Sequence, residues 1–164
     1  MKKLLLIRHA KSSWKDSALA DIERPLNKRG KSEAPLMAKR LKKLNILPDL
    51  ILCSPARRAV STAKKIAQVL DVPRKAIVYE KLIYQGDASM LLKMVQQIDD
   101  SYNQVFLIGH NPDLTSFAWK LALFEGENIP TCGIVSIHFE CDSWKDVQHG
   151  MGKVMFFDYP KMHL

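Results

Sequence analysis

Three short apolar runs, each followed closely by arginine or histidine, constrain the fold of this chain more than any other feature. The runs and the residues after them are Leu4–Ile7 before Arg8 and His9, Leu50–Cys53 before Ser54 to Arg58, and Val105–Ile108 before Gly109 and His110. Apolar runs of this length are typical of buried strands. Ligands of open α/β sheets bind beyond the carboxyl ends of the strands. The sequence therefore predicts that two histidines and several arginines meet at one sheet edge, as an anion site containing a nucleophile.

Strand-like and helix-like segments alternate along the chain. Strands are predicted over residues 3–7, 49–53, 76–79, 104–108, 133–139 and 153–157, and helices over residues 28–44, 55–70, 87–98 and 112–124. This alternation is typical of βαβ units around a largely parallel sheet. A chain of 164 residues is long enough for one complete core, so we expect an α/β fold and a single domain over residues 1–164.

The composition favours a globular protein with anionic partners. Apolar residues make up 47% of the chain, and the net charge is +8 at pH 7. No apolar stretch reaches the roughly 20 residues that span a bilayer, and the first apolar run is too short for a signal peptide. Basic stretches are not interleaved with aromatic residues, as they are in many nucleic-acid-binding proteins. We expect a cytoplasmic protein that binds neither membranes nor nucleic acid.

The cysteines and the remaining basic residues suggest structural roles. Cys53, Cys132 and Cys141 lack the paired spacing of a zinc site, so we expect no metal and no cofactor. Cys53 falls in a predicted strand and should be a buried, reduced thiol. The cluster Lys39, Arg40, Lys42 and Lys43 indicates a solvated helix end. Helical spacing predicts that Phe117, Trp119 and Leu121 belong to the core.

Local signals place helix starts beside the predicted site. Ser54–Pro55 and Asn111–Pro112 each combine an N-cap residue with proline at the first helical position. Both helix N-termini would then offer free N–H groups to an anion. Pro35 is expected to kink the first helix or to delay its start. Residues 10–27 predict a long loop over the site, and the residues after Asp158 a loose terminus.

Four segments, in order along the chain, resemble the motifs of the histidine phosphatase superfamily. They are Arg8–Ser12, Arg24–Gly30, Ser54–Ala63 and Gly109–Pro112, which are similar to the family's Arg-His-Gly, Pro-Leu-Thr-x-x-Gly, Ser-Pro-x-x-Arg-Ala-x-x-Thr-Ala and second-histidine elements. Ala10 and Lys15 depart from the glycine and asparagine of relatives. The resemblance implies a phosphoglycerate mutase-like three-layer α/β/α sandwich. The short chain and its Gly-His-Asn-Pro segment look like the SixA-like phosphohistidine phosphatase branch.

The resemblance also implies roles for individual residues. His9 matches the nucleophile, and a neutral imidazole both attacks phosphorus well and leaves well. Arg8 and Arg58 match phosphate clamps, because a guanidinium fork fits pairs of phosphoryl oxygens. His110 matches the second catalytic histidine, which holds charge in the transition state. Ser12 matches a phosphate-site serine of larger relatives.

The proton donor is the least defined part of the predicted site. Relatives supply a carboxylate after the third strand, which makes Glu80 the candidate acid and Asp87 the second choice. Phosphohistidine expels imidazole, a better leaving group than an alkoxide, so a phosphohistidine phosphatase depends less on a strong acid. Arg57 precedes Arg58, but the family spacing selects Arg58 and leaves Arg57 on a solvated face. His138, His149 and His163 fit no site.

These features predict a metal-independent phosphatase with a phosphohistidine intermediate. The expected substrate is a phosphorylated histidine on a protein, because so small a chain has little room for lids that would enclose a metabolite. Two alternatives stay open: a phosphatase of small phosphate esters, and a non-catalytic phosphate-binding signalling adaptor. A metallohydrolase would need paired carboxylates near the histidines, which the sequence lacks. Nothing in the sequence indicates an oligomeric state.

Overall fold

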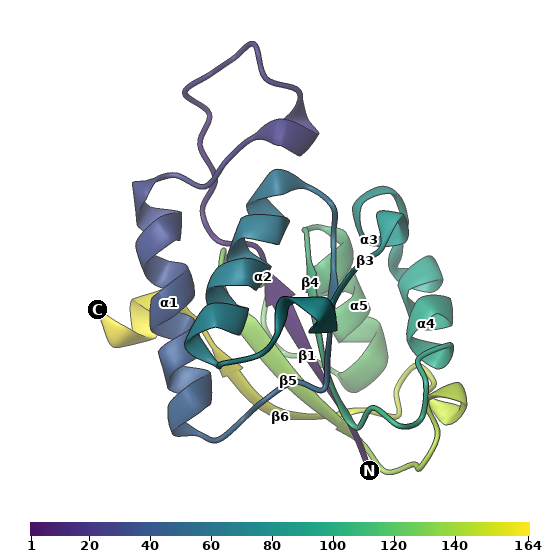
Figure 1. The fold of residues 1–164 in the computed structure, drawn as a ribbon. Coiled ribbons are helices and arrows are strands. Elements are labelled where there is room, and N and C mark those ends of the chain that lie inside the picture. The colour runs from purple at the N-terminus through teal and green to yellow at the C-terminus, as the bar shows by residue number, and fades with distance from the viewer.

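The computed structural model describes all 164 residues and consists of one six-stranded sheet between two layers of helices (Figure 1). The strands are β1 (Lys2–Arg8), β2 (Leu50–Cys53), β3 (Ile77–Tyr79), β4 (Gln104–Gly109), β5 (Ile134–Phe139) and β6 (Lys153–Asp158). Their order across the sheet is β3-β2-β4-β1-β5-β6. The six predicted strands and the α/β class are confirmed.

The first four strands in this order are parallel, and at the other edge β5 runs antiparallel to both of its neighbours, β1 and β6. The register pairs Arg8 of β1 with Gly109 of β4, and Cys53 of β2 with Ile108 of β4. Three parallel strands therefore end level with one another. The residues that follow them must lie side by side at one edge.

Helices cover both faces of the sheet. They are α1 (Lys28–Lys43), α2 (Arg57–Val69), α3 (Lys81–Gln85), α4 (Ala88–Gln96) and α5 (Asp113–Ala122), with 3₁₀ turns η1 (Asp21–Glu23), η2 (Arg74–Ala76), η3 (Trp144–Asp146) and η4 (Pro160–His163). Leu5 and Ile7 face the core under α1 and α2, while Leu4 and Leu6 face the core under α4 and α5. This alternation follows from the two-residue period of a strand. No helix combines the length and apolarity needed to cross a membrane.

α1 begins at Lys28, as predicted. Pro35 does not delay this start, because the Asn27 side chain accepts the N–H of Gly30 and caps the helix well before the proline. Two other predicted helix starts are wrong by one or two residues. α2 begins at Arg57 rather than at residue 55, because the Ser54 hydroxyl is engaged in a turn with the N–H of Ala56. α5 likewise begins one residue later than predicted, at Asp113.

Two further predictions fail because of contacts that the sequence pattern does not reveal. Trp119 is 48% exposed, and its indole N–H donates to the carbonyl of Gly126, although Phe117 and Leu121 are buried as predicted. The C-terminal residues are not loose, since η4 buries Pro160 and the His163 ring contacts Asp158. Cys53 is buried and unpaired in the structure, as predicted.

The segment over residues 10–27 is a loop that extends past the carboxyl ends of the strands, at the top of Figure 1. It contains more regular structure than the predicted loop, because Ser12 and Leu26 form a β-bridge and η1 forms a helical turn in its second half. The N–H of Asn27 also donates to the carbonyl of Lys11. These bonds hold the two arms of the loop together at its base.

Gly30 allows α1 to approach this loop closely. A Cβ atom at this position would lie 2.1 Å from the carbonyl oxygen of Lys11. We expect Gly30→Ala to displace the chain just after His9 and to lower the free energy of unfolding by about 2 kcal/mol, more than the roughly 1 kcal/mol that alanine adds to helix propensity. Urea unfolding measures this change, with the exposed Ser32→Ala as a neutral control. A Gly30→Ala protein as stable as the parent would contradict this packing argument.

Candidate active site

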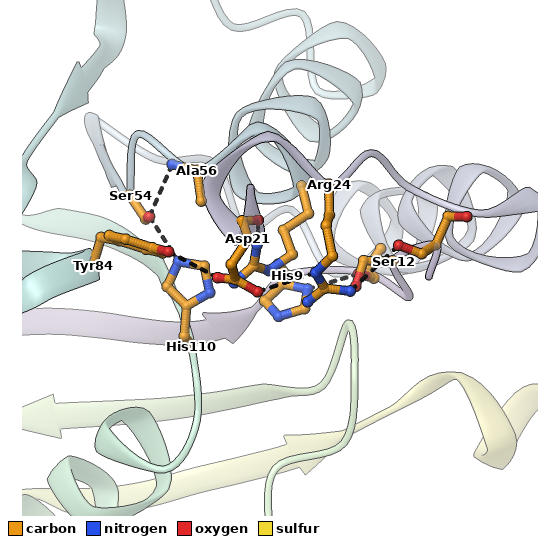
Figure 2. Close-up of polar contacts among 11 residues, drawn as sticks. His9, Ser12, Asp21, Arg24, Ser54, Ala56, Tyr84 and His110 are labelled. Atoms are coloured by element: carbon orange, nitrogen blue, oxygen red, sulfur yellow. Dashed lines mark hydrogen bonds and ion pairs between the residues drawn. The ribbon is translucent and has the colours of Figure 1, made fainter. Parts of the chain in front are cut away.

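The level ends of β1, β2 and β4 bring distant segments of the sequence into one cavity. His9 follows β1, and its backbone N–H donates to the carbonyl of Gly109 at 3.1 Å. The ring centroids of His9 and His110 lie 5.1 Å apart. Figure 2 shows the two rings near each other. A cavity of about 190 Å³ is lined by both histidines together with Arg8 and Arg58. All four residues of the predicted core of the site thus meet in one place.

The His9 ring is held in a single tautomer. Its Nδ1 lies 2.7 Å from the carbonyl oxygen of Ala10, and a carbonyl can only accept, so Nδ1 carries the ring proton. The Nε2 atom therefore keeps its lone pair. Burial, helped by the nearby charge of His110 and Arg58, lowers the pKa of His9 to about 3. The ring is neutral at pH 7, the state that a nucleophilic imidazole requires.

Ser54 orients the His110 ring. The Ser54 hydroxyl oxygen accepts the N–H of Ala56 at 3.1 Å and lies 2.7 Å from Nε2 of His110 (Figure 2). The hydroxyl proton can then be donated to Nε2, which leaves the ring proton on Nδ1. Burial, followed by the charge of Arg58, lowers the pKa of His110 to about 4. His110 is thus a neutral donor at pH 7.

Two guanidinium groups, that of Arg58 buried and that of Arg8 partly buried, add positive charge to the cavity. Arg58 is only 5% exposed, and its Nε is buried without a hydrogen-bond partner. Arg8 donates through Nη1 to the carbonyl of Ile129 at 3.1 Å, and its Nε is also unpaired. Burial and the charge of Arg58 lower the pKa of Arg8. Two arginines that line one cavity with few hydrogen-bond partners are typical of an anion site.

Asp21 of η1 reaches the site from the loop. Its carboxylate accepts from Nη2 of Arg58 at 2.9 Å and from the Tyr84 hydroxyl at 2.8 Å, and its backbone carbonyl accepts from Nη1 of Arg58 at 2.7 Å. The Tyr84 hydroxyl and the two arginines, Arg58 and Arg24, hold the pKa of Asp21 far below its usual range. Asp21 is therefore ionised, and it accepts hydrogen bonds from both terminal nitrogens of the Arg58 guanidinium.

Ser12 and Arg24 form the opposite wall of the cavity. The Ser12 hydroxyl accepts from Nη1 of Arg24 at 2.8 Å, and both residues are buried and line the cavity. Ser12 keeps its own hydroxyl proton for a further acceptor. Nε of Arg24 donates to Asp21 of the same arm at 3.0 Å, so the bond from Arg24 to Ser12 ties Asp21 and its arm of the loop to the other arm.

Glu80 and Asp87 do not lie where the sequence-based prediction requires a proton donor. Glu80 lines a separate, mainly apolar cavity with Leu52 and Leu82. The Asp87 side chain caps α4 by accepting the N–H of Met90. The chain that follows β3 does reach the site, but through Tyr84, whose hydroxyl contacts Asp21. The geometry gives neither carboxylate support as the acid.

Sequence reasoning missed Tyr84 and Ser54 as parts of the site. Tyr84 lies on α3, a helix of five residues that is too short to produce a periodic pattern. Ser54 was interpreted as a helix cap, whereas its hydroxyl contacts His110. Its place directly after a buried strand, like that of His9, was a usable signal. No three His, Cys, Asp or Glu side chains lie together in an arrangement that could hold a metal ion.

Both histidines make stability depend on pH. Their pKa values, about 3 for His9 and about 4 for His110, lie below the value of about 6.5 for an unfolded chain. The unfolded state then binds more protons below pH 6.5, so stability should fall as the pH drops through that value. Between pH 7 and pH 5 the free energy of unfolding should fall by at most about 2 kcal/mol per histidine.

Urea unfolding at these two pH values measures this loss. His9→Asn should reduce it, whereas substitution of the exposed His149 should leave it unchanged. An equal loss of unfolding free energy between pH 7 and pH 5 in the parent and in His9→Asn would contradict the assignment of a buried neutral ring.

The fold and the cavity together describe an α/β protein in which a neutral histidine shares a cavity with several arginines. Residues 4–83 match the histidine phosphatase superfamily (branch 1). An uncharacterized chloroplastic protein of Arabidopsis thaliana is 31% identical over an alignment of 157 positions that covers 88% of this chain and 70% of that protein. The chain belongs to the histidine phosphatase superfamily.

Solved structures share the whole fold. The protein histidine phosphatase SixA, solved with tungstate, superposes with a TM-score of 0.82 at 24% identity and covers 98% of both chains. A mycobacterial glucosyl-3-phosphoglycerate phosphatase, solved with VO3, has a TM-score of 0.70 at 13% identity over 98% of this chain and 100% of that one. These matches confirm the phosphoglycerate mutase-like α/β/α sandwich and the SixA-like architecture.

Proposed function

We propose that this protein is a phosphatase that hydrolyses phosphorylated histidine on a protein, through a phosphohistidine intermediate on His9. One observation carries the proposal. Nε of Arg8, Nε of Arg58 and Nδ1 of His110 are buried without hydrogen-bond partners, and all three residues line the cavity that contains His9. Buried polar groups are nearly always paired. Three unpaired nitrogens around a neutral imidazole suit a phosphoryl group.

The reaction proceeds in two displacements. Nε2 of His9 attacks phosphorus, and the bond between phosphorus and the substrate nitrogen breaks as the N–P bond to His9 forms. The departing imidazole nitrogen takes a proton from solvent. Water then attacks the phosphorus, the bond to His9 breaks, and phosphate leaves. The role of Arg8, Arg58 and His110 is to stabilise charge on the three non-reacting oxygens in both steps.

Two features of the cavity support phosphohistidine over a small phosphate ester. No carboxylic acid lines the cavity, and an ester would need an acid to protonate its alkoxide, whereas imidazole leaves more readily. The cavity volume of about 190 Å³ is also below the roughly 300–1,000 Å³ of common small-ligand pockets. A phosphoryl group fits this space while the rest of the substrate remains outside.

Turnover measurements test the proposal directly. A peptide phosphorylated on histidine should be hydrolysed with a kcat/KM at least 100-fold above that of any sugar or nucleotide phosphate in a panel. EDTA should leave this activity unchanged, because metal independence is part of the proposal. Faster hydrolysis of a small ester would favour the metabolite phosphatase. Tight phosphate binding without any turnover would favour the signalling adaptor.

Asp21 should weaken the binding of phosphate, because its carboxylate and the phosphate compete for the Arg58 fork. We expect Asp21→Asn to lower the inhibition constant of inorganic phosphate about tenfold, in line with removal of one negative charge from a partly buried site. Competitive inhibition assays measure this. Asp16→Asn, an exposed substitution in the same loop, is the control. Weaker inhibition of Asp21→Asn by phosphate would show instead that Asp21 positions Arg58.

A further inference from the structure

A broad groove of about 1160 Å³ lies beside the catalytic cavity and shares Lys11, Ser12 and Trp14 with it. Its walls come from the two arms of the loop over residues 10–27 and from the first turn of α1. The groove is therefore continuous with the cavity. Anything that lies in it can reach His9 with a side chain.

The groove is strongly basic. Its lining includes Lys11, Lys15, Lys28, Arg29 and Lys31 and contains no carboxylate. Arg29 pairs with the buried Glu33, but the four lysines are exposed and form no ion pair. A solvated helix face usually mixes both signs of charge, because like charges three or four residues apart repel. Lys28 and Lys31 have that spacing, which favours an anionic partner over a merely solvated surface.

Trp14 forms a fixed aromatic wall where the groove meets the cavity. Its side chain is 74% exposed, and the guanidinium carbon of Arg24 lies 3.5 Å from its ring centroid. Arg24 is itself buried and bonded to Ser12 and Asp21. Exposed aromatic side chains that are held in place are common anchors at protein interfaces. Trp14 thus offers a rigid surface for the residue next to the reacting group.

We propose that this groove docks an acidic polypeptide segment that carries the phosphorylated side chain, with Trp14 packed against the residue beside it. The proposal rests on the proposed function, because the segment must deliver its phosphoryl group to His9. The groove exceeds the roughly 300–1,000 Å³ of small-ligand pockets, which favours a chain over a metabolite. A nucleic-acid strand would call for successive stacking aromatics, and the groove has one.

Peptides with different flanking residues test this surface. The substrates are one phosphohistidine peptide flanked by glutamates, the same peptide flanked by serines, and phosphoramidate. We expect kcat/KM to be at least tenfold higher for the glutamate-flanked peptide than for the serine-flanked one, because its KM is lower. This kcat/KM should fall with added salt. Lys28→Glu/Lys31→Glu should remove this advantage and leave phosphoramidate turnover within twofold of the parent.

A matched control makes the same change in net charge far from the groove. Arg74→Glu/Lys75→Glu alters two exposed cations in η2, which precedes β3 and so lies at the opposite end of the sheet. This variant should keep the preference for the glutamate-flanked peptide. Equal kcat/KM for both peptides, or equal losses in the two double variants, would overturn the docking proposal.

Binding assays separate the docking proposal from the proposed function. Fluorescence anisotropy with His9→Ala compares labelled glutamate-flanked and serine-flanked phosphohistidine peptides without turnover. If no phosphohistidine substrate is hydrolysed by the parent, the proposed function fails, while preferential binding of the glutamate-flanked peptide would still support an acidic partner. Trp14→Ala should weaken that binding at least fivefold. Tighter binding of a single-stranded RNA than of the acidic peptide would overturn the docking proposal.

Discussion

Replacing His9 with alanine should abolish hydrolysis of phosphohistidine, lowering kcat by at least about 10⁴-fold, since the nucleophile itself is removed. The expected loss is this large because no other neutral imidazole is placed to substitute: Nε2 of His110 is engaged by Ser54. Binding of phosphate should change by less than about fivefold, because the unpaired nitrogens of Arg8, Arg58 and His110 remain. Single-turnover kinetics and phosphate inhibition measure the two effects separately.

Covalent labelling provides the second readout for His9. Incubation of the parent protein with a labelled phosphoryl donor and rapid quenching should give a label that is stable in base and labile in acid, as expected for a phosphorylated imidazole. His9→Ala should not be labelled, whereas substitution of the exposed His149 should leave labelling intact. A label of the same stability on His9→Ala would place the nucleophile elsewhere. A parent that turns over substrate without any label would point to direct attack by water.

Arg58→Ala should lower kcat by about 10³-fold and weaken inhibition by tungstate or phosphate at least tenfold, because one fork of donors to the transferring group is lost. The side chain is 5% exposed and extends from the first turn of α2 into the cavity. Arg58→Lys should recover only part of the loss, because an ammonium group is a point charge and cannot bind two oxygens in a plane. The same kinetic and inhibition assays apply.

The neighbouring arginine supplies a matched control. Arg57 is exposed and does not line the cavity, so Arg57→Ala changes the net charge by the same amount and should keep activity within twofold. Comparable losses in Arg57→Ala and Arg58→Ala would mean that general positive charge, and not the buried fork, supports the reaction. Circular dichroism and urea unfolding of both variants would show that the comparison concerns folded proteins.

The strands were predictable because their signal is local. Runs such as Leu4–Ile7 and Val105–Ile108 are continuous and apolar, and both are fully buried on the two faces of the sheet. α3 was not predictable, because its five residues span little more than one turn. The edge position of β3 was not predictable either, since strand order depends on crossovers and not on the composition of a strand. Glu80 lines the separate cavity beside Leu52 and Leu82, whereas Tyr84, four residues later, reaches Asp21.

The placement of Arg8, His9, Arg58 and His110 after buried strands at one sheet edge was predictable, because apolar periodicity and motif spacing are encoded along the chain. Their chemical states depend on the folded environment. The tautomer of His9 depends on the Ala10 carbonyl, and the low pKa values of both histidines depend on burial. Tyr84, 63 residues from Asp21, joins the site only because the loop folds over it. Desolvation and charge convergence are sums over neighbours that are distant in sequence, so no local pattern contains them.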